Sequence, residues 1–175
     1  MSDAEDRERA IELWREAYRR QMDGDLEGAV ELYRRSIAMY PTAEAHTFLG
    51  WTYSFQGRLE EATAECLKAI EADPDFGNPY NDIGVYLMQQ GKLDEAVPWL
   101  EKAKLAARYE PRQFPYMNLG RIYIKLGRWP DALREFEGAV RVAPEDAEAY
   151  KALHGLLARL NGHHVRSEGP VRGGH

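Results

Sequence analysis

The fold is decided by a stretch late in the chain, residues 113–144, which reads QFPYMNLGRIYIKLGRWPDALREFEGAVRVAP. Gly127 separates two segments in which apolar residues recur three to four positions apart, the spacing of an amphipathic helix. Glycine commonly ends a helix, and Pro144 cannot continue one. The stretch therefore predicts two helices joined by a short turn.

The same arrangement occurs four times along the chain. Four glycines are spaced 33, 34 and 36 residues apart, and an alanine follows each of them at the same distance. A small residue also precedes each glycine, at the place where the two helices would cross and a larger side chain would push them apart. These aligned positions are Gly24, Gly57, Gly91 and Gly127; Ala29, Ala62, Ala96 and Ala132; and Ala17, Gly50, Gly84 and Gly120.

The repeated pattern resembles the tetratricopeptide repeat, over residues 10–146. The first unit departs most from that pattern and the fourth keeps it best. The resemblance implies an all-α fold, a right-handed superhelical array of antiparallel helix pairs (an α-solenoid) with about nine helices. In the fourth unit it is carried by Tyr116, Leu119, Gly120, Tyr123, Gly127, Ala132, Phe136, Ala139 and Pro144.

We predict one domain, residues 1–162, with repeats at about 10–42, 43–76, 77–112 and 113–146. A capping helix at about 146–160 is expected to shield the last repeat, and residues 163–175 are expected to be disordered. The third unit is longer than the others, by residues that fall between Ala103 and Pro111. We expect its second helix to run longer, with Pro98 bending the first turns.

The resemblance implies that the first helix of each pair lines a concave groove. That face is rich in aromatic residues, and exposed aromatic side chains are favoured binding anchors. The alternative is that these side chains pack between neighbouring first helices. The predicted peptide-binding groove consists of Trp14, Tyr18, Trp51, Phe55, Asn78, Asn81, Met88, Phe114, Met117, Arg121 and Lys125.

Arg121 and Lys125 lie four residues apart, on one face of a predicted helix. With Asn78 and Asn81 they could hold a carboxylate or the backbone of a bound peptide. The alternative is a solvated basic pair. The Lys/Asn/Arg pattern of chaperone-tail clamps is absent, because only Asn118 fits it.

Composition excludes several other functions. The net charge of −6 argues against a nucleic-acid binder, and the single Cys66 excludes an internal disulfide. No metal site, cofactor motif or catalytic constellation is recognisable, and no apolar run is long enough to span a membrane. The charged N-terminus favours a cytoplasmic protein, and the excess of arginine over lysine favours a bacterial source.

We therefore predict a non-enzymatic adaptor that binds a peptide segment or a partner helix in its groove. The alternative is a self-associating scaffold that forms a homodimer through the apolar groove or the capping face. An enzyme and an RNA-binding protein are less favoured, because the sequence offers no catalytic constellation and the chain is acidic.

Overall fold

The computed structural model describes the backbone of residues 3–167 and the side chains of residues 3–162. Within that range the chain is helical, without strands apart from one isolated bridge between Phe76 and Arg108. The helices are α1 (Asp3–Met22), α2 (Leu26–Met39), α3 (Ala43–Phe55), α4 (Leu59–Ala72), α5 (Asn78–Gln89), α6 (Leu93–Leu105), α7 (Gln113–Lys125), α8 (Trp129–Val142) and α9 (Ala147–Ser167).

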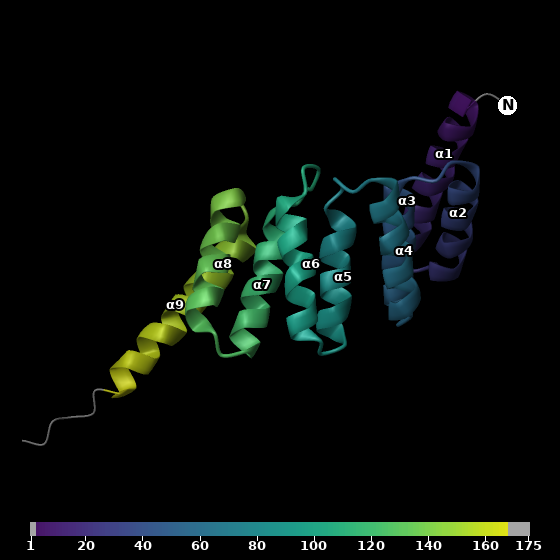
Figure 1. Ribbon diagram of the computed structural model, residues 1–175. Helices are drawn as coiled ribbons and strands as arrows, with labels where there is room; N and C mark the ends of the chain where they lie inside the picture. Colours follow the sequence, from purple (N-terminus) through teal and green to yellow (C-terminus); the bar gives the residue numbers. More distant parts are fainter. Residues whose placement is uncertain (1–2, 168–175) are drawn as a thin grey trace, which may run out of the picture. The chain divides into compact units, whose positions relative to one another are not determined.

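The helices form two compact units, Met1–Glu110 and Pro111–His175. The first unit contains three helix pairs, α1/α2, α3/α4 and α5/α6, and in it α2 also packs against α3 and α4 against α5. The second contains the pair α7/α8, followed by α9, which packs against both of these helices. Figure 1 shows the two helices of each pair side by side and antiparallel. The predicted all-α solenoid of helix pairs is confirmed.

The four aligned glycines form the turn inside each pair. Their φ angles lie between 71° and 87°, and among the described residues no other type of residue has a positive φ. This backbone conformation is accessible to glycine at little cost and strains a residue that carries a Cβ. The predicted helix ends at these glycines are confirmed.

The small residues before the turns permit the close approach of the two helices of a pair. A Cβ added to Gly84 would lie 2.6 Å from Cδ2 of Leu100, and one added to Gly50 would lie 2.8 Å from the carbonyl oxygen of Ala62. These separations are well below van der Waals contact. The crossing positions predicted from the repeat are therefore real points of helix contact.

The extra residues of the third repeat do not lengthen its second helix. The predicted longer helix is wrong, because α6 ends at Leu105 and residues 106–112 form a loop. The backbone N–H of Arg108 donates to the carbonyl of Asp75 at 2.9 Å, and the N–H of Gly77 donates to the carbonyl of Arg108 at 2.9 Å. Hydrogen bonds to the segment before α5 thus replace those of a continued helix. Pro98 lies inside α6, and the bend predicted there stays a prediction.

The last helix is longer than predicted. It runs to Ser167 instead of ending near Leu160, so Asn161 and Gly162 do not stop it. A glycine inside a helix costs only about 1 kcal/mol relative to alanine, and Gly162 does not adopt a positive φ. We predicted a disordered tail over residues 163–175. Residues 163–167 of it belong to α9, and residues 168–175 lie outside the described residues.

Candidate functional site

Five aromatic side chains of the first unit form a continuous cluster on α1 and α3. We call it the aromatic ladder. Trp14 and Tyr18 stack with ring centroids 6.0 Å apart on α1, and Trp51 and Phe55 lie 5.1 Å apart on α3. Phe48 joins the two halves. The ladder therefore consists of Trp14, Tyr18, Phe48, Trp51 and Phe55.

Phe48 is the centre of the ladder, and the sequence analysis did not include it. Its ring lies 5.1 Å from Trp14, 5.6 Å from Tyr18 and 5.8 Å from Trp51, each time nearly perpendicular. Edge-to-face pairs of this kind contribute about 0.5–1.5 kcal/mol beyond simple burial. The available signal was its place three residues before Trp51, since residues three apart share a helix face.

The ladder is half packed and half exposed. Trp14 and Phe48 pack against the buried core of the first unit. Tyr18 is 38% exposed and Phe55 is 55% exposed. The packing alternative thus holds for the inner rings, which lie between α1 and α3. The outer rings face solvent, and their role as binding anchors stays a prediction.

A buried polar contact fixes the helices beneath the ladder. Gln21 of α1 is 4% exposed, and its Oε1 accepts a hydrogen bond from the hydroxyl of Tyr33 on α2 at 2.9 Å. The Oγ1 of Thr52 on α3 lies 3.0 Å from the same oxygen. Burial raises the pKa of Tyr33, so its hydroxyl stays protonated and able to donate. One amide oxygen of α1 therefore makes polar contacts with both α2 and α3.

The other predicted groove residues of the first unit differ in accessibility. The Nδ2 of Asn78 lies 3.5 Å from the carbonyl oxygen of Glu110, and Met88 is half-buried. Asn81 is 7% exposed, too little to contact a ligand without rearrangement. Asn81 therefore does not belong to the exposed surface of α5.

The predicted groove residues of the second unit all lie on α7. Phe114 is 45% exposed, Lys125 is exposed, and Met117 is buried at 4%. Arg121 is exposed and donates to Oδ1 of Asn118 at 3.0 Å. Because Asn78 and Asn81 belong to the other unit, their joint site with Arg121 and Lys125 stays a prediction.

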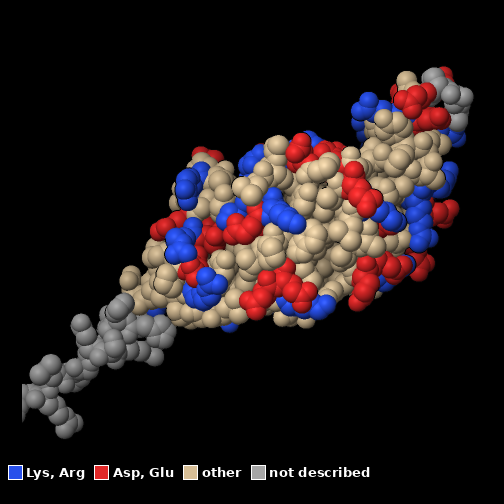
Figure 2. Space-filling model, in the orientation of Figure 1, with Lys and Arg blue, Asp and Glu red and all other residues tan. Residues whose placement is uncertain are grey.

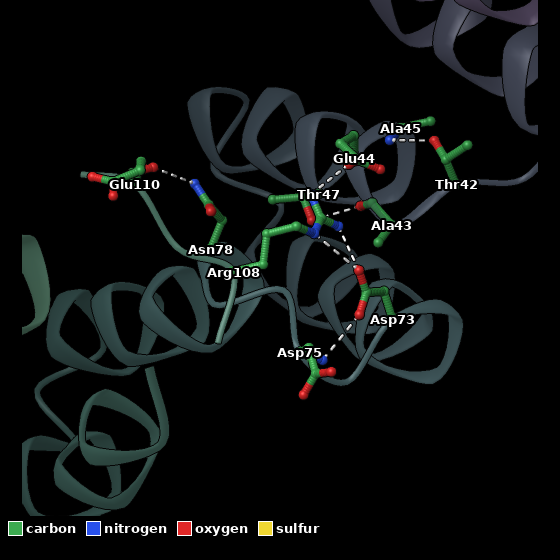
Figure 3. Close-up of polar contacts among 10 residues, drawn as sticks. All are labelled: Thr42, Ala43, Glu44, Ala45, Thr47, Asp73, Asp75, Asn78, Arg108 and Glu110. Atoms are coloured by element: carbon green, nitrogen blue, oxygen red, sulfur yellow. Dashed lines mark hydrogen bonds and ion pairs between the residues drawn. The ribbon is translucent and has the colours of Figure 1, made fainter. Parts of the chain in front are cut away.

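The loop of residues 106–112, here called the Arg108 loop, ties three segments of the first unit together. Figure 3 shows the Arg108 side chain between Glu44 at the start of α3 and Asp73 at the end of α4. Its Nη1 lies 2.7 Å from Oε1 of Glu44, and its Nε lies 3.1 Å from Oδ2 of Asp73. The Arg108 hydrogen bond lowers the pKa of Asp73 against the opposing effect of burial. The guanidinium also lies 4.2 Å from the ring centroid of Phe76.

Two buried residues that could carry chemistry have structural surroundings instead. Nδ1 of His46 lies 2.7 Å from Oε2 of Glu65, whose Oε1 lies 2.7 Å from Nζ of Lys68. Burial raises the pKa of Glu65, but the hydrogen bonds from His46 and Lys68 outweigh it and lower the pKa overall. Cys66 is fully buried, and burial raises the pKa of its thiol. Both His46 and Cys66 are therefore part of the packing between α3 and α4.

Other kinds of site would need a patch of one charge, a cluster of metal ligands or a long apolar helix. Figure 2 shows acidic and basic groups intermingled over the face drawn, without a large patch of one sign. Among the residues with described side chains, no three histidine, cysteine or carboxylate groups gather as metal ligands would. No helix within residues 3–167 has the length and apolar character needed to cross a bilayer.

Comparison with known families gives three overlapping matches. Models described as tetratricopeptide repeat match residues 43–76, 65–97 and 87–160. Together they run from residue 43 to residue 160, which is more than half of the chain. The first repeat lies outside them, in keeping with its departure from the repeat pattern.

Individual relatives are distant and mostly longer. The type IV pilus assembly protein PilF of Pseudomonas aeruginosa is 26% identical over 120 residues, which are 68% of this chain and 48% of PilF. The CTR9 homolog of Arabidopsis thaliana is 25% identical over 133 residues, 73% of this chain and 12% of that protein. The chain thus spans half or less of the length of these relatives.

Solved structures agree on the fold. A structure of Pseudomonas aeruginosa PilF superposes with a TM-score of 0.79 at 23% identity, covering 91% of this chain and 71% of that one. A structure of MamA superposes with a TM-score of 0.66 at 20% identity, covering 83% and 84%. At these identities the likeness shows a common fold.

Proposed function

The chain belongs to the tetratricopeptide repeat family, and we propose that it is a non-enzymatic protein–protein interaction module that binds a peptide segment or partner helix over the aromatic ladder. Its relatives with this fold support a binding scaffold. The observation that carries the proposal is the exposure of Tyr18 and Phe55 on the first helices of two neighbouring pairs.

The inner rings of the ladder hold the outer rings in an ordered position before a partner binds. Trp14 and Phe48 are held by the core, so Tyr18 stacks on a fixed neighbour instead of moving freely. A side chain that is already ordered loses little entropy when a partner covers it. Exposed Met22, at 50%, and Ile11, at 38%, add apolar area on the same helix. Apolar surface of this kind is typical of binding sites.

The second unit contributes a different kind of surface in this proposal. Exposed Phe114 of α7 offers an apolar contact, and Lys125 offers a positive charge on the same helix. Arg121 keeps further guanidinium donors besides the one bonded to Asn118. We propose that α7 gives the second unit a binding surface of its own, which combines an apolar contact with positive charge.

A paired capture experiment tests the ladder. The intact chain and the Tyr18→Ala/Phe55→Ala variant serve as baits in the same lysate, after circular dichroism shows equal helicity. The matched control is Leu67→Ala, which removes an apolar side chain of α4 that is 43% exposed. We expect a protein that the intact chain and Leu67→Ala retain and the ladder variant loses. Equal capture by all three baits would place the interface elsewhere.

Self-association is the second candidate function. Tyr150 on α9 is 40% exposed and stacks on His154 with ring centroids 6.3 Å apart, which leaves apolar surface on the last helix. A homodimer formed through this face would hide it. Light scattering over a hundredfold range of concentration tests the proposal, and a constant monomeric mass would eliminate it.

We also propose that the protein acts in the cytoplasm of a bacterial cell. The composition of its basic residues supports the bacterial source, and a lone buried thiol at Cys66 is compatible with a reducing compartment. Cell fractionation with an antibody against the chain tests the location, and recovery outside the cytoplasmic fraction would contradict it.

A further inference from the structure

A pocket opens beside the aromatic ladder, between α1, the end of α2 and the start of α3. Its volume is about 280 Å³, enough for one or two amino-acid side chains. Ile11 and Trp14 of α1 form part of its apolar wall, and Tyr40 lies opposite at the end of α2. Since Trp14 also belongs to the aromatic ladder, the pocket and the ladder adjoin.

Most polar groups in the wall of this pocket already have partners. The hydroxyl of Ser36 donates to the carbonyl of Ala10 at 2.8 Å. Oγ1 of Thr42 accepts from the N–H of Ala45 at 3.1 Å, as a helix cap. The carboxylate of Glu44 is engaged by Arg108. A ligand in the pocket therefore meets few hydrogen-bonding groups from these residues.

Two guanidinium groups also belong to the wall of the pocket. Arg7 and Arg15 both line the pocket, two helical turns apart on α1 with Ile11 between them. Arg7 lies 5.9 Å from the ring centroid of Tyr40, and in the part of the chain with described side chains no carboxylate forms an ion pair with Arg7 or Arg15. Both are donors only and carry a fixed positive charge.

Charge and shape together select the ligand. Arg7 and Arg15 also line an adjoining pocket, to which α1 adds Asp3, Glu8 and Glu12. The carboxylate in the lining of the pocket described here is that of Glu44, which is hydrogen-bonded to Arg108. The side chains that line this pocket carry two positive charges, on Arg7 and Arg15, and one negative charge, on Glu44. A ligand with an apolar body and a carboxylate would satisfy the apolar wall and the two guanidinium groups at once.

We propose that this pocket binds an acidic side chain of the partner polypeptide, an aspartate or glutamate next to an apolar residue. The proposal rests on the proposed function, because the same partner segment would continue over the aromatic ladder. Starting at Trp14, the centroids of successive rings of the ladder lie 5.1–5.8 Å apart. About two residues of an extended chain cover that distance. The acidic residue should therefore lie within about four residues of the aromatic-binding part of the segment.

The test uses a phage-displayed library of random 12-residue peptides, selected on the full chain. Recovered peptides should carry an aspartate or glutamate next to an apolar residue. One such peptide is synthesised, together with its Glu→Gln or Asp→Asn version, and titrated by fluorescence anisotropy. The protein variants are Arg7→Gln/Arg15→Gln, the matched control Arg9→Gln/Arg35→Gln, whose exposed arginines do not line the pocket, and Phe55→Ala.

We expect Arg7→Gln/Arg15→Gln to weaken binding about 5- to 30-fold, the range of a partly exposed charge-assisted contact. The control pair should bind as the unaltered chain does. The neutral peptide should bind weakly and equally to the unaltered chain and to Arg7→Gln/Arg15→Gln. Raising the salt concentration should weaken only the binding of the acidic peptide to chains that keep Arg7 and Arg15.

Four results would overturn the proposal. Selected peptides without acidic residues would show that the pocket does not bind a carboxylate. An equal loss of affinity in the two double-arginine variants would show the same. If such peptides still depend on Phe55, the proposed function stands and only the pocket inference fails. A library without any binder, or binders that ignore both Phe55 and the arginines, would overturn the inference and the ladder proposal together.

Discussion

Helices α3 and α7 occupy the same place in their repeats, 70 residues apart, and present opposite chemistry. Where α3 carries Phe48, Trp51 and Phe55, α7 carries Asn118, Arg121 and Lys125. The aromatic set forms most of the ladder, whereas Arg121 bonds to Asn118 and Lys125 is exposed. One backbone pattern thus supports an apolar surface in one unit and a polar surface in the other.

The two helices agree at the positions that hold a helix pair together. Gly50 corresponds to Gly120, and Tyr53 corresponds to Tyr123. The guanidinium of Arg58 lies 4.2 Å from the ring centroid of Tyr53, and that of Arg128 lies 4.6 Å from that of Tyr123. The repeat therefore maintains pair packing, and the positions between these shared residues are free to determine what is bound.

The largest effect is expected at the shared glycines. Gly50→Ala should lower the free energy of unfolding by about 2–3 kcal/mol, because the new Cβ would lie 2.8 Å from the backbone oxygen of Ala62. Gly120→Ala should cost a similar amount, about 2–3 kcal/mol, because its Cβ would clash with Cε1 of Phe136, whose ring is itself buried. Urea denaturation followed by circular dichroism measures both.

Gly155 on α9 supplies the control for these substitutions. A Cβ there would have no neighbour within 4 Å, so Gly155→Ala should raise stability by about 0.5–1 kcal/mol through its better helix propensity. If Gly50→Ala, Gly120→Ala and Gly155→Ala change the free energy of unfolding by the same amount, the small residues are not needed for the close approach of the helices.

The next effect concerns the position at which the two helices differ most. Phe48→Ala should cost about 2–3 kcal/mol, because it removes a partly buried ring and three edge-to-face contacts. Asn118→Ala at the same repeat position should cost about 1 kcal/mol, the value of a hydrogen-bonding side chain. Chemical denaturation measures both, and an equal cost would mean that the ladder adds nothing to stability.

These two predictions mark what the sequence could and could not reveal. The glycine and alanine columns predicted the helix pairs, because steric limits at a turn and at a crossing act locally and recur. Phe48 and the Arg108 loop were missed, because their roles depend on partners that lie elsewhere in the chain, such as Trp14 for Phe48 and Glu44 for Arg108. The burial of Asn81 and Met117 likewise depends on packing that helix periodicity does not resolve.

In the third repeat, the position that differs most between α3 and α7 is occupied by a residue whose charge depends on pH. Asp82 stands at the repeat position of Phe48 and Asn118, and burial raises its pKa from 3.8 to about 7 although Asn81 hydrogen-bonds to it. The folded chain therefore binds more protons than the unfolded chain between about pH 4 and 7. The stability that protonated Asp82 contributes is present below pH 4 and is lost as the pH rises through about 7.

Asp82→Asn should remove this dependence. At pH 8 the variant should be more stable than the unaltered chain by about 1–2 kcal/mol, because the charge of a partly buried carboxylate disappears. At pH 4.5 the two chains should differ little. Denaturation at both pH values measures the change, with Asp94→Asn on the exposed surface of α6 as control. A gain of the same size at both pH values would assign the effect to something other than titration of Asp82.

The smallest effect tests the feature that α3 and α7 share. Arg58→Ala and Arg128→Ala each remove a guanidinium from a tyrosine ring and from an acidic neighbour, Glu61 and Asp131 respectively. Each should lower Tm by about 1–3 °C, because exposed cation–π contacts and exposed ion pairs are weak. Lysine at either position should restore only part of the loss, since it cannot stack on the ring as a plane. Differential scanning calorimetry compares the variants. Equal shifts would support one packing rule for both helix pairs, whereas a shift confined to Arg58 would show that the first unit depends on this contact and the second does not.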